Sequence, residues 1–179
     1  MTENLGRRAE LRPAHPEDFD YCARLYFEGM ENIIKELNLN VDAHAAAFRK
    51  SWDVTQVRII ILDRTDIGWM QSFVKDEALF LGQLFVDGAS RRQGIGTEVV
   101  KTLIEEAARA GQALTLGVVK TNPALQLYEF ALRTRMCASS TCGATGECHV
   151  RSGLVKVLSY RRDSFTRLLL PRHDQSLTH

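Results

Sequence analysis

The sequence has no excess of charge of either sign, because 23 lysine and arginine residues nearly cancel 22 aspartate and glutamate residues in a chain of 179. Proteins that bind nucleic acid or a membrane surface usually carry a basic excess, so we expect neither partner. The chain also lacks an apolar run long enough to span a bilayer, and its first residues include no apolar stretch of the signal-peptide type. These absences predict a cytoplasmic protein.

Cysteine is scarce as well, since Cys22 stands alone and only three others, Cys137, Cys142 and Cys148, gather late in the chain. A reducing compartment disfavours disulfides between them. With His149, the late cysteines could form a zinc site in a metal-bearing interaction module. Their spacings of four and five intervening residues are looser than a Cys-x-x-Cys pair, so we expect no metal.

The hydrophobic pattern predicts a mixed α/β domain with elements in the order β-α-α-β-β-β-α-β-α. A short first strand ends at Pro13, and β-branched runs indicate an antiparallel series of strands after Trp52. Apolar residues at three- and four-residue spacing indicate a helix before Gly111. The predicted helices cover residues 16–30, 43–52 and 96–110, with one more opening at 122, and the later predicted strands cover residues 57–62, 67–74, 79–86 and 114–119.

The segment that can carry chemistry is Arg91-Arg92-Gln93-Gly94-Ile95-Gly96, at the start of the third predicted helix. Two glycines one residue apart let the backbone approach an anion, and a helix N-terminus directs unpaired N–H groups at it. A P-loop would need Lys and then Ser or Thr where Thr97 and Glu98 stand, and a dinucleotide fold would need a glycine at Val99. Taken alone, the segment also fits an ordinary tight turn.

The residues on both sides of this segment make it more specific. Leu84-Phe85-Val86 ends the strand before it, and Asn122-Pro123-Ala124 and Leu127-Tyr128-Glu129 follow the next strand. This arrangement resembles the GNAT superfamily of N-acetyltransferases from residue 11 to residue 129, although the alanine after Asn122 is shifted. The resemblance implies an α/β fold of the GNAT type, with a mixed, mainly antiparallel central sheet flanked by helices.

The resemblance also implies an activity: an N-acetyltransferase that moves the acetyl group of acetyl-CoA to a primary amine of a small molecule or peptide, by direct attack in a ternary complex. Tyr128 would protonate the leaving thiolate. The alternative is an acyl-CoA-binding protein with weak or no catalysis, and a homodimer is left open. The residues that the resemblance assigns to acetyl-CoA binding are Leu84, Phe85, Val86, Arg91, Arg92, Gln93, Gly94, Ile95, Gly96, Thr97 and Asn122.

No residue stands out as the general base that a protonated amine requires. Asp76 and Glu77 are candidates, as is a water molecule, but an ordinary solvated turn explains both acids as well. The strand residues expected to face the amine are Leu81, Gln83 and Phe85, and none of them titrates. The acids of the first helical region, which could attract a cation or form a solvated face, are Glu28, Glu31 and Glu36.

The sequence departs from the family after Glu129, where the usual Gly-Phe turn is missing. We therefore divide it into an acetyltransferase domain, residues 1–136, and an atypical tail, residues 137–179. Codons for residues 137–146 can be chosen so that dropping two bases spells Arg-Lys-Phe-Tyr-Met-Arg-Arg-Asp-Trp before a stop, which looks like a closing strand of the family. A frameshift is therefore one hypothesis, and the loss of the usual closing strands would leave a sheet edge that has to be covered. The nucleotide sequence tests it.

Overall fold

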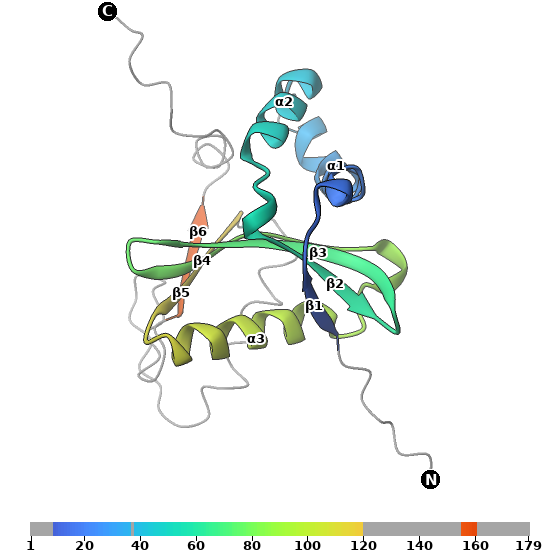
Figure 1. Cartoon of the computed structure of the whole chain (residues 1–179). Helices are drawn as coiled ribbons and strands as arrows, with labels where there is room; N and C mark the ends of the chain where they lie inside the picture. The colour runs from blue at the N-terminus through green and yellow to red at the C-terminus, as the bar shows by residue number, and fades with distance from the viewer. Residues whose placement is uncertain (1–8, 37, 120–154, 161–179) are drawn as a thin grey trace, which may run out of the picture.

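The protein is described here by a computed structural model that covers residues 9–36, 38–119 and 155–160. Helices and strands follow the expected order as far as β5 (Figure 1). The helices are η1 (Pro16–Asp18), α1 (Phe19–Glu36), α2 (Val41–Ser51), η2 (Val54–Gln56), η3 (Gly88–Ser90) and α3 (Ile95–Arg109), where η marks a short 3₁₀ helix. The strands are β1 (Glu10–Pro13), β2 (Val57–Leu62), β3 (Thr65–Lys75), β4 (Ala78–Val86), β5 (Ala113–Val119) and β6 (Val155–Tyr160).

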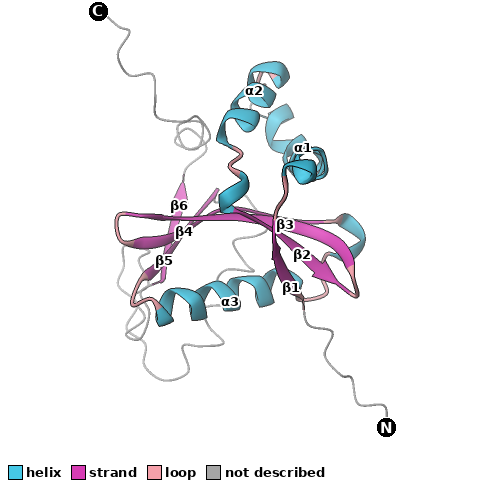
Figure 2. Cartoon of the chain, in the orientation of Figure 1, coloured by secondary structure: helices cyan, strands magenta, loops and turns pink. Residues whose placement is uncertain are grey.

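The described strands form one sheet in the order β1-β2-β3-β4-β5-β6. β1 to β4 pair antiparallel, whereas β5 runs parallel to β4 and β6 runs parallel to β5. α1 and α2 lie over one face of the sheet and α3 lies over the other (Figures 1 and 2). The expectation of a mixed, mainly antiparallel sheet flanked by helices is therefore confirmed.

The two hairpins that join β2, β3 and β4 have loops of two residues each. The loop residues, which are Asp63 and Arg64 in one hairpin and Asp76 and Glu77 in the other, all have positive φ angles between 50° and 64°. Two positive φ angles in succession characterise the turn that matches the natural twist of a hairpin. Asp76 and Glu77 are exposed at the tip of their hairpin, which supports the interpretation of a solvated turn.

The helices over the first face begin at defined caps. Asp18 accepts a hydrogen bond from the main-chain N–H of His15 at 2.7 Å and receives two from the Arg12 guanidinium, at 2.8 and 2.9 Å. The side chain of Asn40 accepts the N–H of Ala43 at 2.8 Å, so α2 begins at residue 41, two residues earlier than expected. α1 extends six residues beyond its expected end at residue 30.

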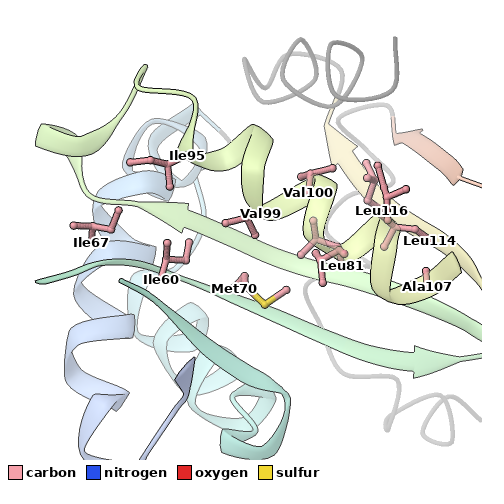
Figure 3. Close-up of a cluster of buried hydrophobic side chains, with 12 residues drawn as sticks. Ile60, Ile67, Met70, Leu81, Ile95, Val99, Val100, Ala107, Leu114 and Leu116 are labelled. Atoms are coloured by element: carbon pink, nitrogen blue, oxygen red, sulfur yellow. The ribbon is translucent and has the colours of Figure 1, made fainter. Parts of the chain in front are cut away.

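A purely aliphatic core fills the space between α3 and the sheet (Figure 3). Burial stabilises each large side chain in it by roughly 1.5–3 kcal/mol. At its border the Arg58 guanidinium of β2 binds both carboxylate oxygens of Glu106 on α3, at 2.8 and 3.0 Å. The buried residues of this cluster are Ile60, Ile67, Met70, Leu81, Ile95, Val99, Val100, Leu103, Ile104, Ala107, Leu114 and Leu116.

The core on the opposite face is rich in aromatic rings and lies beneath α1 and α2. Trp69 of β3 is completely buried, and its ring stacks on that of Phe85 at a centroid distance of 5.3 Å. Tyr26 of α1 stacks on Phe48 of α2 at 4.3 Å and meets Phe85 edge-on at 5.3 Å. Phe85 is therefore held between the sheet and the helices.

A β-bulge at Gly82 changes the direction of the side chains of β4. Gln71 pairs with Gln83 and Ser72 pairs with Leu81, so Gly82 is the extra residue on β4. Before the bulge Leu81 packs against α3, and after it Phe85 packs beneath α1. The expectation that Leu81, Gln83 and Phe85 share one face is therefore wrong for Leu81, because the extra residue breaks the alternation of the strand.

The tail contributes a strand to the sheet. β6 lies within residues 137–179, and its backbone pairs in parallel with β5 from Leu114 opposite Val155 to Val119 opposite Tyr160. β6 therefore covers the outer edge of β5. The division of the chain at residue 136 and the frameshift stay predictions. The late cysteines and His149 lie outside the described residues.

Candidate functional site

β4 and β5 pair over only part of their length. Residues 78–81 pair with residues 113–116, and the ladder ends there, although β4 continues to Val86 and β5 to Val119. The ladder ends at the residue before the bulge, where β4 bends. In the described part of the chain, no strand pairs with the last five residues of β4 on the side of β5. Their main-chain groups on that side are available to an extended ligand.

The hydrogen bonds to β3 show which main-chain groups these are. The N–H of Asp87 donates to the carbonyl of Ile67 at 2.7 Å. Because antiparallel strands alternate between hydrogen-bonded and non-bonded pairs, Phe85 is in the next bonded pair and turns its main-chain groups toward β3. Leu84 and Val86 therefore direct theirs toward β5. In agreement, the Val86 carbonyl accepts a hydrogen bond on that side from Nε of Arg91, at 2.7 Å.

The N-terminus of α3 follows β4 after a loop that contains η3. Gly94 caps the helix with φ +84°, a left-handed conformation that a residue with a Cβ adopts only with strain. The N–H of Glu98 is the first to reach a helical carbonyl, that of Gly94 at 3.1 Å. No side chain caps Gly94, so the N–H groups of Ile95, Gly96 and Thr97 have no acceptor within the helix. This end of α3 is suited to an anion.

The loop between β4 and α3 is shaped by its own hydrogen bonds. The carboxylate of Asp87 accepts the N–H of Ala89 at 3.0 Å, and the Gln93 amide donates to the carbonyl of Ala89 at 3.0 Å. Arg91 and Arg92 are exposed, and Arg92 also has a positive φ, of 60°. The loop therefore places two cations and an uncapped helix end beside the unpaired part of β4.

The predicted cosubstrate-binding residues thus fall into one region, with the exception of Asn122. Residues 84–86 and 91–97 lie together at the junction of β4 and α3. Asn122 and the predicted acid Tyr128 lie outside the described residues, so their positions and roles stay predictions.

The face beneath α1 and α2 contains a buried polar pair that the sequence did not reveal. The hydroxyl of Tyr26 lies 2.8 Å from Nε2 of His44, and both residues are buried. Burial raises the pKa of Tyr26 and lowers that of His44, so both are neutral near pH 7. The sequence signal was weak, because the two residues are 18 positions apart and His44 is one of five scattered histidines.

Four side-chain polar atoms of the described residues are buried without a hydrogen-bond partner: the hydroxyl of Tyr21, Nε1 of Trp52, Nε1 of Trp69 and Oε1 of Gln83. The last two, a donor and an acceptor, belong to the strands on either side of the β3–β4 ladder. Trp69 lies opposite Phe85 on β3, and Gln83 lies two residues before Phe85 on β4. A buried donor or acceptor that finds no partner costs about 1–3 kcal/mol. Such atoms are expected where a ligand or a water molecule binds.

The helix acids considered as binding groups for a cation are engaged elsewhere. Glu28 pairs with Arg24 at 2.9 Å and Glu31 with Lys35 at 2.6 Å, both on exposed positions of α1. The Lys35 ammonium lowers the pKa of Glu31. These i,i+4 pairs are typical of a solvated helix face. Within the described ranges, no group of three or more His, Cys, Asp or Glu side chains could hold a metal ion.

Comparison with known proteins identifies a family. Residues 27–131, more than half of the chain, match the acetyltransferase (GNAT) family. The comparison with curated proteins finds no match. In the described residues, no helix is long and apolar enough to cross a membrane.

Solved structures share the fold at low sequence identity. An N-acetyltransferase of Staphylococcus aureus Mu50 is 17% identical, with 68% of this chain and 88% of that chain covered and a TM-score of 0.54. A Clostridium difficile 630 protein, provisionally described as an acetyltransferase, is 17% identical, with coverages of 76% and 96% and a TM-score of 0.52. A Pyrococcus horikoshii protein with a similar description is 19% identical, with a TM-score of 0.52. The alignment covers 73% of this chain but only 45% of that longer protein.

Proposed function

Because the chain belongs to the GNAT family of acetyltransferases, we propose that it transfers the acetyl group of acetyl-CoA to a primary amine of a small molecule or peptide. The observation that carries this proposal is the unpaired last part of β4, which leads through a short loop to the uncapped N-terminus of α3. A long ligand with an anionic end and an amide-containing arm fits such a site. The anionic end would bind the helix, and the arm would bind the strand.

In the proposed complex the pyrophosphate of acetyl-CoA binds the loop and the helix end. The N–H groups of residues 95–97 donate to its oxygens, and Arg91 and Arg92 neutralise its charge. Gly94 permits the left-handed turn that directs these N–H groups outward. The pantetheine arm then extends from the helix end along β4, where Val86 comes first and Leu84 lies closer to the bulge.

The arm acts as an additional strand on the unpaired side of β4. Its amides exchange hydrogen bonds with the main chain of Val86, and the N–H of Leu84 donates to the thioester oxygen. The N–H of Leu84 and not that of Phe85 is assigned this role, because the main chain of Phe85 is turned toward β3. The hydrogen bond strengthens as the carbonyl oxygen gains negative charge during attack by the amine.

Calorimetric titration with acetyl-CoA, followed by an assay of thiol release with a panel of primary amines, tests the proposal. We expect saturable binding to one site and thiol release that depends on the amine. Desulfo-CoA, which has no thioester, is the matched control: it should bind and release nothing. The absence of acetyl-CoA binding in the titration would contradict the proposal.

The second candidate function is acyl-CoA binding without catalysis, and the departure from the family sequence after Glu129 favours it. The same experiment separates the two functions, because binding without thiol release by any amine supports this alternative. Tyr128→Phe is a second test. Full turnover by this variant would remove Tyr128 as the acid that protonates the thiolate.

A further inference from the structure

The Tyr26–His44 pair lies beside the part of β4 that is proposed to bind the thioester. Tyr26 meets the ring of Phe85 at a centroid distance of 5.3 Å, and Phe85 directly follows Leu84. The closest rings around the pair come from α1, α2 and β4, and they are apolar: Phe27 lies 6.2 Å from His44, and Phe48 lies 4.3 Å from Tyr26. The pair is thus the polar centre of an aromatic layer above this strand.

The pair is electrostatically isolated. Tyr26 is the titratable group that faces His44, and burial is the cause of the lowered pKa of His44. In the described ranges, no charged side chain of α1, α2, β3 or β4 contributes to that shift. A neutral imidazole in such surroundings is a free base at neutral pH, and its Nε2 can accept the hydroxyl proton of Tyr26.

Two unpartnered polar atoms belong to residues around Phe85, the ring that Tyr26 contacts. The rings of Trp69 and Tyr26 lie against Phe85, and Nε1 of Trp69 and Oε1 of Gln83 are both buried without partners. Trp69 itself is completely buried. A ligand that brings an N–H group satisfies Gln83, and one that brings an oxygen satisfies Trp69. A primary amine with a nearby carbonyl or carboxylate oxygen, such as an α-amino acid or a peptide N-terminus, offers both.

We propose that this group of residues is the site of the amine substrate, in which Gln83 and Trp69 hold an amine with an adjacent oxygen and Tyr26 passes its proton to His44. The inference rests on the proposed acetyl transfer. The Tyr26–His44 relay supplies the general base that sequence patterns did not identify. Such a site favours aliphatic amines, because they are protonated at neutral pH and must lose a proton before they attack.

The proton steps balance as follows. The ammonium gives one proton to Oη of Tyr26 while the original hydroxyl proton of Tyr26 moves to Nε2 of His44, so the phenol stays neutral. The amine lone pair then forms the C–N bond, and the C–S bond breaks as the tetrahedral intermediate collapses. The proton that the nitrogen must still lose to become the amide is transferred to the thiolate, which leaves as the free thiol. His44 then returns its proton to solvent.

Two variants remove the relay in different ways. Tyr26→Phe keeps the ring but lacks the hydroxyl, and His44→Gln keeps an oxygen that can accept the Tyr26 hydroxyl but cannot be protonated. Tyr21→Phe is the matched control, because its hydroxyl is also buried on α1 but makes no hydrogen bond to His44. We would measure kcat/KM for an α-amino amide and for a plain alkylamine from pH 6.5 to 10, with acetyl-CoA affinity and melting temperature as checks of folding.

At pH 7 we expect both relay variants to lose about 100-fold in kcat/KM, and at pH 10 to come within about threefold of the parent protein, because the amine then arrives deprotonated. Tyr21→Phe should match the parent at every pH. In the parent protein, the α-amino amide should exceed the alkylamine about tenfold, and Gln83→Leu should abolish that preference.

A loss that is the same at pH 7 and pH 10, or no loss at all, would overturn the relay. Equal rates with the two amines would overturn the assignment of Gln83 and Trp69. Absence of turnover in the parent protein with every amine would instead contradict the proposed function on which this inference rests. The outcomes are therefore distinguishable.

Discussion

At the residue scale, Gly94 shows how a single backbone conformation shapes the N-terminus of α3, the proposed pyrophosphate site. Its φ of +84° turns the chain into α3, and an added Cβ would meet no atom within 4 Å. A substitution here therefore acts through backbone strain and not through a clash. Left-handed backbone costs an ordinary residue about 1–2 kcal/mol.

We expect Gly94→Ala to weaken acetyl-CoA binding at least tenfold, because relief of the strain would redirect the N–H groups of residues 95–97. Asn tolerates the left-handed conformation better, so Gly94→Asn should lose less. Gly88→Ala is the matched control, since Gly88 lies in the same loop, has open space and has no positive φ. Calorimetric titration with acetyl-CoA measures all three, and equal affinities for the two Gly94 variants and the control would contradict the role of strain.

Asp18 links stability to pH. Its hydrogen bonds with Arg12 lower its pKa, and the main-chain N–H of His15 contributes to the same shift. A carboxyl whose pKa is lower in the folded state stabilises the fold above its unfolded pKa, near 3.9, and loses this effect as pH falls through the folded pKa.

The free energy of unfolding should therefore decrease below about pH 4, and Asp18→Asn should remove part of that dependence while costing about 1 kcal/mol at pH 7. Urea unfolding between pH 2.5 and 7 measures both effects. Asp76→Asn, at an exposed hairpin tip that suits asparagine, is the control and should leave the curve unchanged. If the stability of Asp18→Asn decreased at low pH as much as that of the parent protein, other carboxyl groups would dominate the pH dependence of unfolding.

At the scale of elements, α1 is fitted to β4 at one point. A Cβ added to Gly29 would lie 2.8 Å from two atoms of the Phe85 ring. The ring has little freedom to move, because Trp69 stacks on one side and Tyr26 meets it from α1. The close approach of helix and strand therefore depends on a residue without a side chain.

We expect Gly29→Ala to raise the KM for the amine severalfold and to leave acetyl-CoA affinity unchanged, because Phe85 must shift on the amine face. Better helix propensity, worth about 1 kcal/mol, opposes the overpacking cost of about 1–3 kcal/mol, so the melting temperature should fall only slightly. Phe85→Leu introduced together with Gly29→Ala should restore stability non-additively. Additive effects in this double-mutant cycle would mean that the two residues do not clash.

Sequence patterns predicted most elements within a few residues because strong periodicity specifies local structure. The position of the loop at residues 91–96 was also predictable, since its glycines, the strand before it and the helix after it are close in the sequence, whereas its role in acetyl-CoA binding stays a prediction. The bulge was not, because a lone glycine in a strand is a weak signal, and the faces of Leu81 and Gln83 depend on it. The Tyr26–His44 pair was also not predictable from the sequence, since only the packing of α1 on α2 brings the two side chains together.

At the scale of the whole molecule, β6 completes the sheet although its sequence belongs to the atypical tail. A strand edge without a partner promotes association between chains. We expect a chain that ends after residue 154 to melt at least about 4 °C lower and to aggregate at high concentration. A chain that ends after residue 160 keeps β6 and is the control. Equal behaviour of the two truncated chains, by calorimetry and light scattering, would contradict a stabilising role for β6.

The bulge at Gly82 also has an evolutionary consequence. In the proposed complex, neighbouring residues of β4 beyond the bulge have different tasks: the main chain of Leu84 and Val86 binds acetyl-CoA, while the side chains of Gln83 and Phe85 contact the amine. Substitutions of Gln83 and Phe85 would then change the selectivity for the amine without changing acetyl-CoA binding, because main-chain contacts do not depend on the identity of the side chain. A library that randomises Gln83, Phe85 and the facing positions of α1 would therefore explore new recipients with the donor machinery held constant.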